Sequence, residues 1–156
     1  MMPQQMRGRS LRYFGAPGNH WRYALAEPFG YHSHHLKGVN FENAWLTIRD
    51  GDIVIRAGYA WNGCSPCVSV FGLFYFGTPD GAAHLGKPAT YHASLVHDAL
   101  CQWRRELPIS KAASVAVFRQ LLDDVKFPLT GLYAWAVRRF GPHNFLVGRG
   151  RRGIER

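Results

Sequence analysis

The stretch AWLTIRDGDIVIRAGYAW, residues 44–61, predicts a β-hairpin. Every second position on both sides of the Asp-Gly pair at 50–51 is apolar: Leu46 and Ile48 before it, Ile53 and Ile55 after it. Alternation with a period of two is typical of strands. Asp-Gly readily supplies the positive φ angles of a tight two-residue turn.

The hydrophobic period lengthens after residue 87, and this change predicts three helices. The first spans about 88–106, with Pro88 where a missing N–H is harmless. The second begins at the N-cap Ser110 and ends before Pro128, and the third covers about 130–140. Strands followed by helices predict an α+β fold, with a small antiparallel sheet from the N-terminal half packed against about three C-terminal helices.

Length and composition predict one domain. The chain has 156 residues, of which 47% are hydrophobic, and it contains no repeat or linker that would divide it. We expect a single α+β domain over residues 13–145, between basic flexible arms at 1–12 and 146–156. The sequence contains no apolar run of the roughly 18 residues that a membrane span needs and no secretory signal at its start. Its three cysteines are typical of a protein from a reducing compartment.

The formal net charge of +9 favours contact with polyanions. The arginines of the C-terminal arm are Arg149, Arg151, Arg152 and Arg156. This arm has no interleaved aromatic residues to stack on single strands, and no base-reading helix precedes it. We therefore expect only weak, sequence-independent binding of nucleic acid through these arginines.

The segment WNGCSPC, residues 61–67, raises the question of a metal or redox site. A structural zinc site needs four ligands, and no second Cys-x-x-Cys follows in the chain. The sequence therefore predicts no metal here. Instead it predicts a tight polar turn in which Asn62 and Ser65 bond to nearby backbone, with Cys64 as a small buried filler.

Four segments occur in a specific order: IRAGYAWNGCSP (55–66), HASLVHDAL (92–100), SKAASVAVFRQLL (110–122) and LYAWAVRRFG (132–141). Together they resemble an uncharacterised domain-of-unknown-function family of small proteins from tailed phages and prophages. Its signature is a strand ending in a Gly-aromatic pair, a WDGASP-like turn, a helix with His-Asp, and two more helices. The resemblance spans Trp45 to Gly141 and implies this architecture, a phage setting, and a location in the host cytoplasm or the virion.

Three positions depart from the family pattern. Asn62 stands in place of the turn aspartate, Cys64 in place of the turn alanine, and Val115 where an acidic residue is expected in the second helix. The loss of two carboxylates weakens any metal or acid–base site built at these positions.

His97 and Asp98 are the candidate site residues of the first helix. Consecutive helical side chains point about 100° apart, so both can line the rim of one pocket without bonding to each other. In a structural interpretation, Asp98 bonds to the turn at 62–65 as a latch. In a catalytic interpretation, His97 is the general base and Asp98 an orienting group or a metal ligand, and the nucleophile is Ser65 or Cys64.

His92 lies five positions before His97, about 140° around the helix, so the two do not form the i, i+4 pair of a zinc helix. Trp61, Asn62, Cys64 and His92 are the predicted binding residues. No phosphate loop, dinucleotide fingerprint or nucleophile elbow indicates a particular cofactor.

Three functions remain as hypotheses. The favoured one is a phage or prophage accessory protein whose polar pocket, formed by residues 61–66 and the His97-Asp98 helix, binds a small molecule or a host component. The second is a hydrolase that uses His97 and Asp98. The third is a virion-associated or nucleic-acid-binding basic protein.

Overall fold

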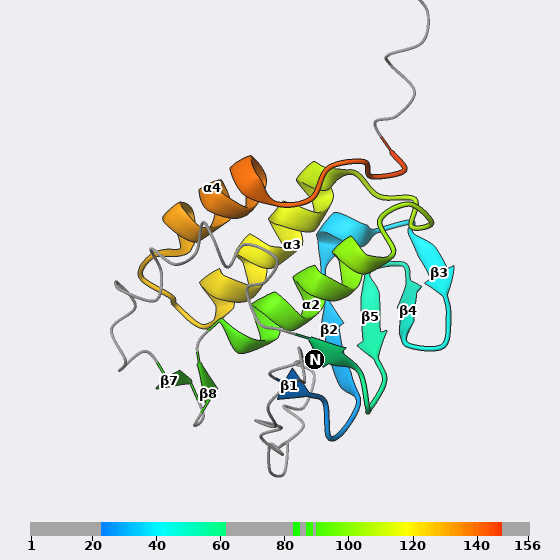
Figure 1. The fold of residues 1–156 in the computed structure, drawn as a ribbon, viewed down its shortest axis with the longest axis horizontal. Helices are drawn as coiled ribbons and strands as arrows, with labels where there is room; N and C mark the ends of the chain where they lie inside the picture. The colour runs from blue at the N-terminus through cyan, green and yellow to red at the C-terminus, as the bar shows by residue number, and fades with distance from the viewer. Residues whose placement is uncertain (1–22, 62–82, 85–86, 89, 148–156) are drawn as a thin grey trace, which may run out of the picture.

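The computed structural model describes residues 23–61, 83–84, 87–88 and 90–147, and it confirms the α+β fold class (Figure 1). Its main sheet is antiparallel, with four strands in the order β2-β5-β4-β3. These strands are β2 (Phe29–His32), β3 (Asn40–Glu42), β4 (Leu46–Arg49) and β5 (Asp52–Ile55). The N-terminal half of the chain supplies the whole sheet.

The predicted hairpin is confirmed in strands β4 and β5. Ile48 pairs with Ile53 across the turn, and both side chains are buried. The turn residues have positive φ angles, 47° at Asp50 and 95° at Gly51. A Cβ added at Gly51 would lie 2.7 Å from the carbonyl oxygen of Ser33, so only glycine fits this position without a backbone shift.

Two short strand pairs lie outside the main sheet. The first joins β1 (Tyr23–Ala24) to β6 (Ala60–Trp61), and the second joins β7 (Ala83–His84) to β8 (Lys87–Pro88). The second pair corrects the predicted start of the first helix, because Pro88 is paired with Ala83 in an extended strand. Proline has no N–H to donate, which suits the end of a short edge strand as well as the first turn of a helix.

The three helices are α2 (Tyr91–Gln102), α3 (Lys111–Asp124) and α4 (Thr130–Phe140). Helix α2 begins three residues later and ends four residues earlier than the predicted range of 88–106. The other two helices are confirmed: the Ser110 hydroxyl accepts a bond from the Ala113 amide at 3.1 Å, and α4 ends at Phe140 with Gly141 as its C-cap. Helix α3 packs against both α2 and α4 (Figure 1).

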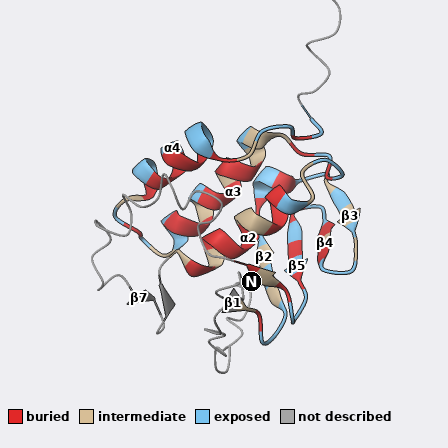
Figure 2. Ribbon diagram, in the orientation of Figure 1, coloured by how far each residue is buried: buried red, intermediate tan, exposed pale blue. Residues whose placement is uncertain are grey.

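One hydrophobic core joins the sheet to the helices. Its fully buried members include Leu46 and Ile55 from the sheet, Leu95 from α2, and Phe118 and Leu122 from α3. Figure 2 shows α2 almost entirely buried or half-buried, whereas α4 has exposed turns on its outer side. No helix among the described residues is long and apolar enough to cross a membrane.

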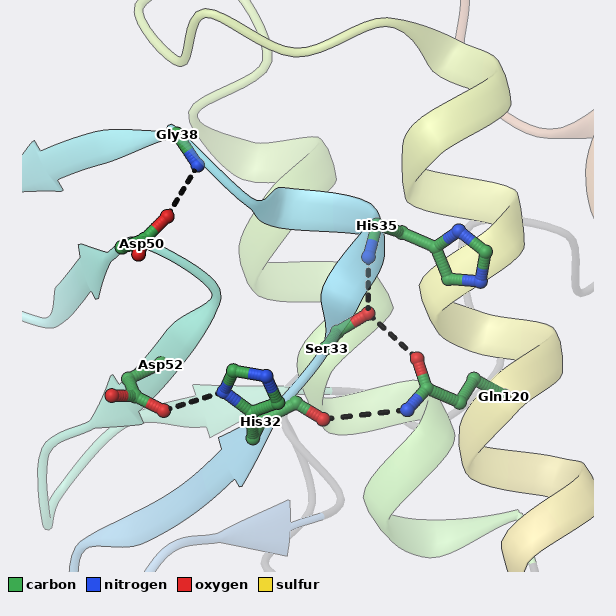
Figure 3. A network of polar contacts seen from close by, with 7 residues as sticks. All are labelled: His32, Ser33, His35, Gly38, Asp50, Asp52 and Gln120. Carbon is green, nitrogen blue, oxygen red and sulfur yellow. Dashed lines mark hydrogen bonds and ion pairs between the residues drawn. The ribbon is translucent and has the colours of Figure 1, made fainter.

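A polar contact also ties the sheet to the helices. The short 3-10 helix η1 (His34–Leu36) begins after Ser33, whose hydroxyl donates to Gln120 Oε1 of α3 at 2.7 Å (Figure 3). Gln120 Nε2 in turn donates to the carbonyl of His32 at 3.3 Å. Ser33 is fully buried, so this pairing satisfies a hydroxyl that water cannot reach.

Candidate functional site

The start of the predicted turn lies against helix α2. Trp61, at the end of β6, is 1% exposed, and its indole N–H donates to the Ser94 hydroxyl at 3.3 Å. Ser94 donates to the carbonyl of Tyr91 at 2.9 Å, which fixes the orientation of its hydroxyl. The end of β6 therefore lies beside the first turns of α2.

Three polar residues of α2 occur at intervals of four along one side of the helix: Ser94, Asp98 and Gln102. The first bonds to Trp61, and the last accepts a bond from the Tyr59 hydroxyl at 3.0 Å. Since i, i+4 positions lie on one helical face, Asp98 lies on the same face as these two contacts, and its charge acts on the Tyr59 phenol.

Asp98 is partly buried, and burial raises the pKa of its carboxyl well above the usual value. Among the described residues, none donates a hydrogen bond to this carboxyl or forms an ion pair with it. Burial also raises the pKa of the Tyr59 phenol, and the nearby charges of Asp98 and Cys101 raise it to a smaller extent. Asp98 therefore lies close to Tyr59, and its surroundings favour the neutral form of its carboxyl group.

Three tryptophan rings, those of Trp45, Trp61 and Trp103, lie around Tyr59, and Tyr91 meets Trp61 edge-on. We call these five residues the aromatic cluster. The Tyr59 ring centroid lies 6.3 Å from that of Trp61, 5.9 Å from that of Trp103 and 6.5 Å from that of Trp45. Trp45 is 40% exposed and Trp103 is half-buried, so the aromatic cluster extends to the surface.

His97 lies on a different side of α2 from Asp98. Its ring packs edge-on against Phe118 of α3, with centroids 5.3 Å apart. Its Nε2 is 3.4 Å from the Cys101 sulfur, one helical turn further on. Burial and, to a smaller extent, the positive charge of Lys111 lower the pKa of His97 to about 4. The imidazole is therefore neutral over the physiological range.

His92 lies between strand β2 and Tyr91, at the start of α2. Its ring stacks on Phe29 with centroids 4.5 Å apart and planes 10° apart, and it meets Tyr91 edge-on at 5.0 Å. The three predicted turn residues Asn62, Cys64 and Ser65 lie outside the described residues, as does Cys67. A hydrogen bond between Asp98 and the turn therefore stays a prediction.

Sequence reasoning missed Tyr59, Gln102 and Cys101 at this site. The spacing held a partial signal, because Cys101 follows His97 by four residues and Gln102 follows Asp98 by four, which places each pair on one helical face. No comparable signal linked α2 to Tyr59, which lies 43 residues before Gln102 in the sequence.

A second polar group surrounds the histidines at 32–35 (Figure 3). His32 Nδ1 lies 2.7 Å from Asp52 Oδ1, and both side chains are more than half exposed. The ring centroids of His34 and His35 are 3.9 Å apart. Burial and, to a smaller extent, the charge of His34 lower the pKa of His35. Within the described part of the chain, no three His, Cys, Asp or Glu side chains are grouped to hold a metal ion.

Comparison of the chain with protein-family models, with curated proteins and with solved structures finds no match.

Proposed function

We propose that this chain is an accessory protein of the tailed-phage or prophage type that binds an organic cation at Asp98 and the aromatic cluster. The cation is an ammonium group carried by a small molecule or by a host component. The observation that carries the proposal is the Asp98 carboxyl, which is partly buried beside Tyr59 and accepts no hydrogen bond from any described residue. The order of motifs along the chain supports the phage setting.

The chemistry of the site favours a cation over an anion or a neutral ligand. Burying an ionised carboxylate is costly, so the surroundings of Asp98 favour its neutral form, and a positive charge beside it would offset this cost. The faces of tyrosine and tryptophan rings attract cations through their quadrupoles, most strongly where water is excluded. Asp98 and the aromatic cluster therefore offer two kinds of attraction to the same charged group.

We expect wild-type protein to bind choline at least tenfold more tightly than its neutral isostere 3,3-dimethylbutanol, because only the former gains the charge interactions. Tryptophan fluorescence can report binding, since three of the five tryptophans belong to the aromatic cluster. Asp98→Asn should abolish the preference for the cation. The matched control is Asp123→Asn, on the exposed side of α3, which should retain it. Equal affinity for both ligands in the wild type would contradict the proposal.

The same substitution should stabilise the protein. The unfolded Asp98 carboxyl has a pKa of about 3.9, whereas the folded pKa is raised, so folding is penalised increasingly as the pH rises above that value. Asp98→Asn removes this penalty, and we expect the free energy of unfolding at pH 7.5 to increase by about 1 kcal/mol. Urea unfolding measures the change. A loss of about 1–3 kcal/mol instead would support the structural latch to the turn at 62–65.

The hydrolase is the second candidate, and one observation favours it. Cys101 and His97 lie 3.4 Å apart, which is the arrangement of a thiol nucleophile and its base. Two properties place it second: the Cys101 side chain is 6% exposed, and the lowered pKa of His97 makes the imidazole a weak proton acceptor. Hydrolysis of an activated ester that disappears in Cys101→Ser would reverse this order.

A further inference from the structure

Helix α4 carries an outward-facing surface of large apolar side chains. Its inner side, which includes Tyr133 and Val137, is buried. On the outer side Leu132 is 49% exposed, Trp135 56% and Phe140 42%. Figure 2 shows the outer turns of α4 exposed at the edge of the helical layer. Single exposed apolar residues are ordinary, but three on one short helix mark an interaction surface.

Two arginines lie among these apolar side chains. Leu132, Trp135 and Arg139 follow an i, i+3, i+7 spacing and therefore share one stripe of α4. The Trp135 and Phe140 rings meet edge-on at 5.8 Å, and the Arg139 guanidinium lies 5.4 Å from the Phe140 centroid. Arg138 is also exposed. We call these five residues, Leu132, Trp135, Arg138, Arg139 and Phe140, the α4 surface.

The charge of this region is entirely positive. Helix α4 contains no aspartate or glutamate, and neither does any other position from 125 to 147. A partner must therefore present negative charge together with an apolar phase that accepts leucine, tryptophan and phenylalanine. A second copy of the chain does not fit, because two α4 surfaces would bring four arginines together without a counter-charge.

We propose that the α4 surface docks onto an anionic lipid bilayer. Tryptophan and arginine are suited to the headgroup region, where the ring lies at the boundary and the guanidinium contacts phosphate, while leucine and phenylalanine enter the acyl layer. Single-stranded nucleic acid fits less well, since Leu132 offers no ring for stacking and Arg139 already lies over the Phe140 ring. With 11 residues, α4 lies along the surface rather than across the membrane.

The test is co-sedimentation of the full chain with vesicles of phosphatidylcholine containing one third phosphatidylglycerol. Trp135→Ala combined with Leu132→Ser should lower the partition coefficient at least tenfold, because it removes most of the inserted apolar area. Arg138→Gln with Arg139→Gln should lower it by a similar factor on the anionic vesicles only. Val54→Ser, a 41% exposed position on the sheet, is the matched control and should bind like the wild type.

All five changed residues are exposed, so the variants should keep their unfolding free energies within about 0.5 kcal/mol, and urea unfolding checks this. Equal binding to pure phosphatidylcholine, undiminished binding by the Trp135 and Leu132 variant, or no binding to anionic vesicles would each overturn the proposal. So would a single-stranded oligonucleotide that displaces the protein from vesicles and requires Trp135 for its own binding. A chain ending at Val147 should still show the Trp135 dependence, which separates the α4 surface from the arginines of 148–156.

Discussion

Phe118→Ala should lower the free energy of unfolding by about 3–5 kcal/mol. Phe118 is 1% exposed on α3, the helix that contacts both α2 and α4, and its ring packs against His97 of α2. Removing it loses the transfer energy of the ring and leaves a cavity that rigid neighbouring helices cannot fill. Urea unfolding at pH 7.5 measures the loss, and a change below about 1 kcal/mol would show that the core relaxes around the gap.

The same variant should also change the titration of His97. Its imidazole packs against Phe118, so the new cavity has a polar wall that can hold water. Hydration reduces the burial that lowers the pKa of His97, and the pKa should rise from about 4 toward the usual value. NMR titration of the histidine signals measures this. Phe118→Leu is the control, and it can be measured even if Phe118→Ala does not fold. It should lower the free energy of unfolding by less than Phe118→Ala does, and it should leave the pKa of His97 lowered.

The sequence predicted the hairpin and two of the three helices, because the signals there were local. Asp50-Gly51 supplies its own turn geometry, and Ser110 caps α3 within three residues. The start of α2 was predicted wrongly for an equally local reason. Pro88 suits both a helical first turn and an edge strand, and only its pairing with Ala83 decides between them.

The candidate site was only partly predictable. Helical geometry showed that His97 and Asp98 point in different directions, but not which neighbours each would meet. Phe118 lies on the next helix and Tyr59 before strand β6, and no spacing rule connects these segments to α2. The polarity of Asp98 was visible in the sequence, whereas its burial beside an aromatic cluster depends on the tertiary fold.

The stability of this protein should fall as the pH is lowered from 7 to 5. In the unfolded chain His97 takes up a proton near its usual pKa of about 6.5, but in the folded protein it does so only near about 4. Between these values the unfolded state binds the extra proton, so acid shifts the equilibrium toward unfolding. The difference between these two pKa values corresponds to an expected loss of about 1–2 kcal/mol at pH 5, and urea unfolding across the pH range measures it.

The loss of stability between pH 7 and pH 5 is the acid limb of the stability profile. His97→Gln should flatten this limb, since glutamine does not titrate. The control His34→Gln changes an exposed histidine of η1 and should leave the limb in place. Asp98 acts in the opposite direction: its raised pKa lowers stability as the pH increases. The wild-type profile should therefore have a maximum, with an acid limb that requires His97 and an alkaline limb that requires Asp98. If either limb persists after its own residue is replaced, then that residue is not the buried titrating group that its surroundings indicate.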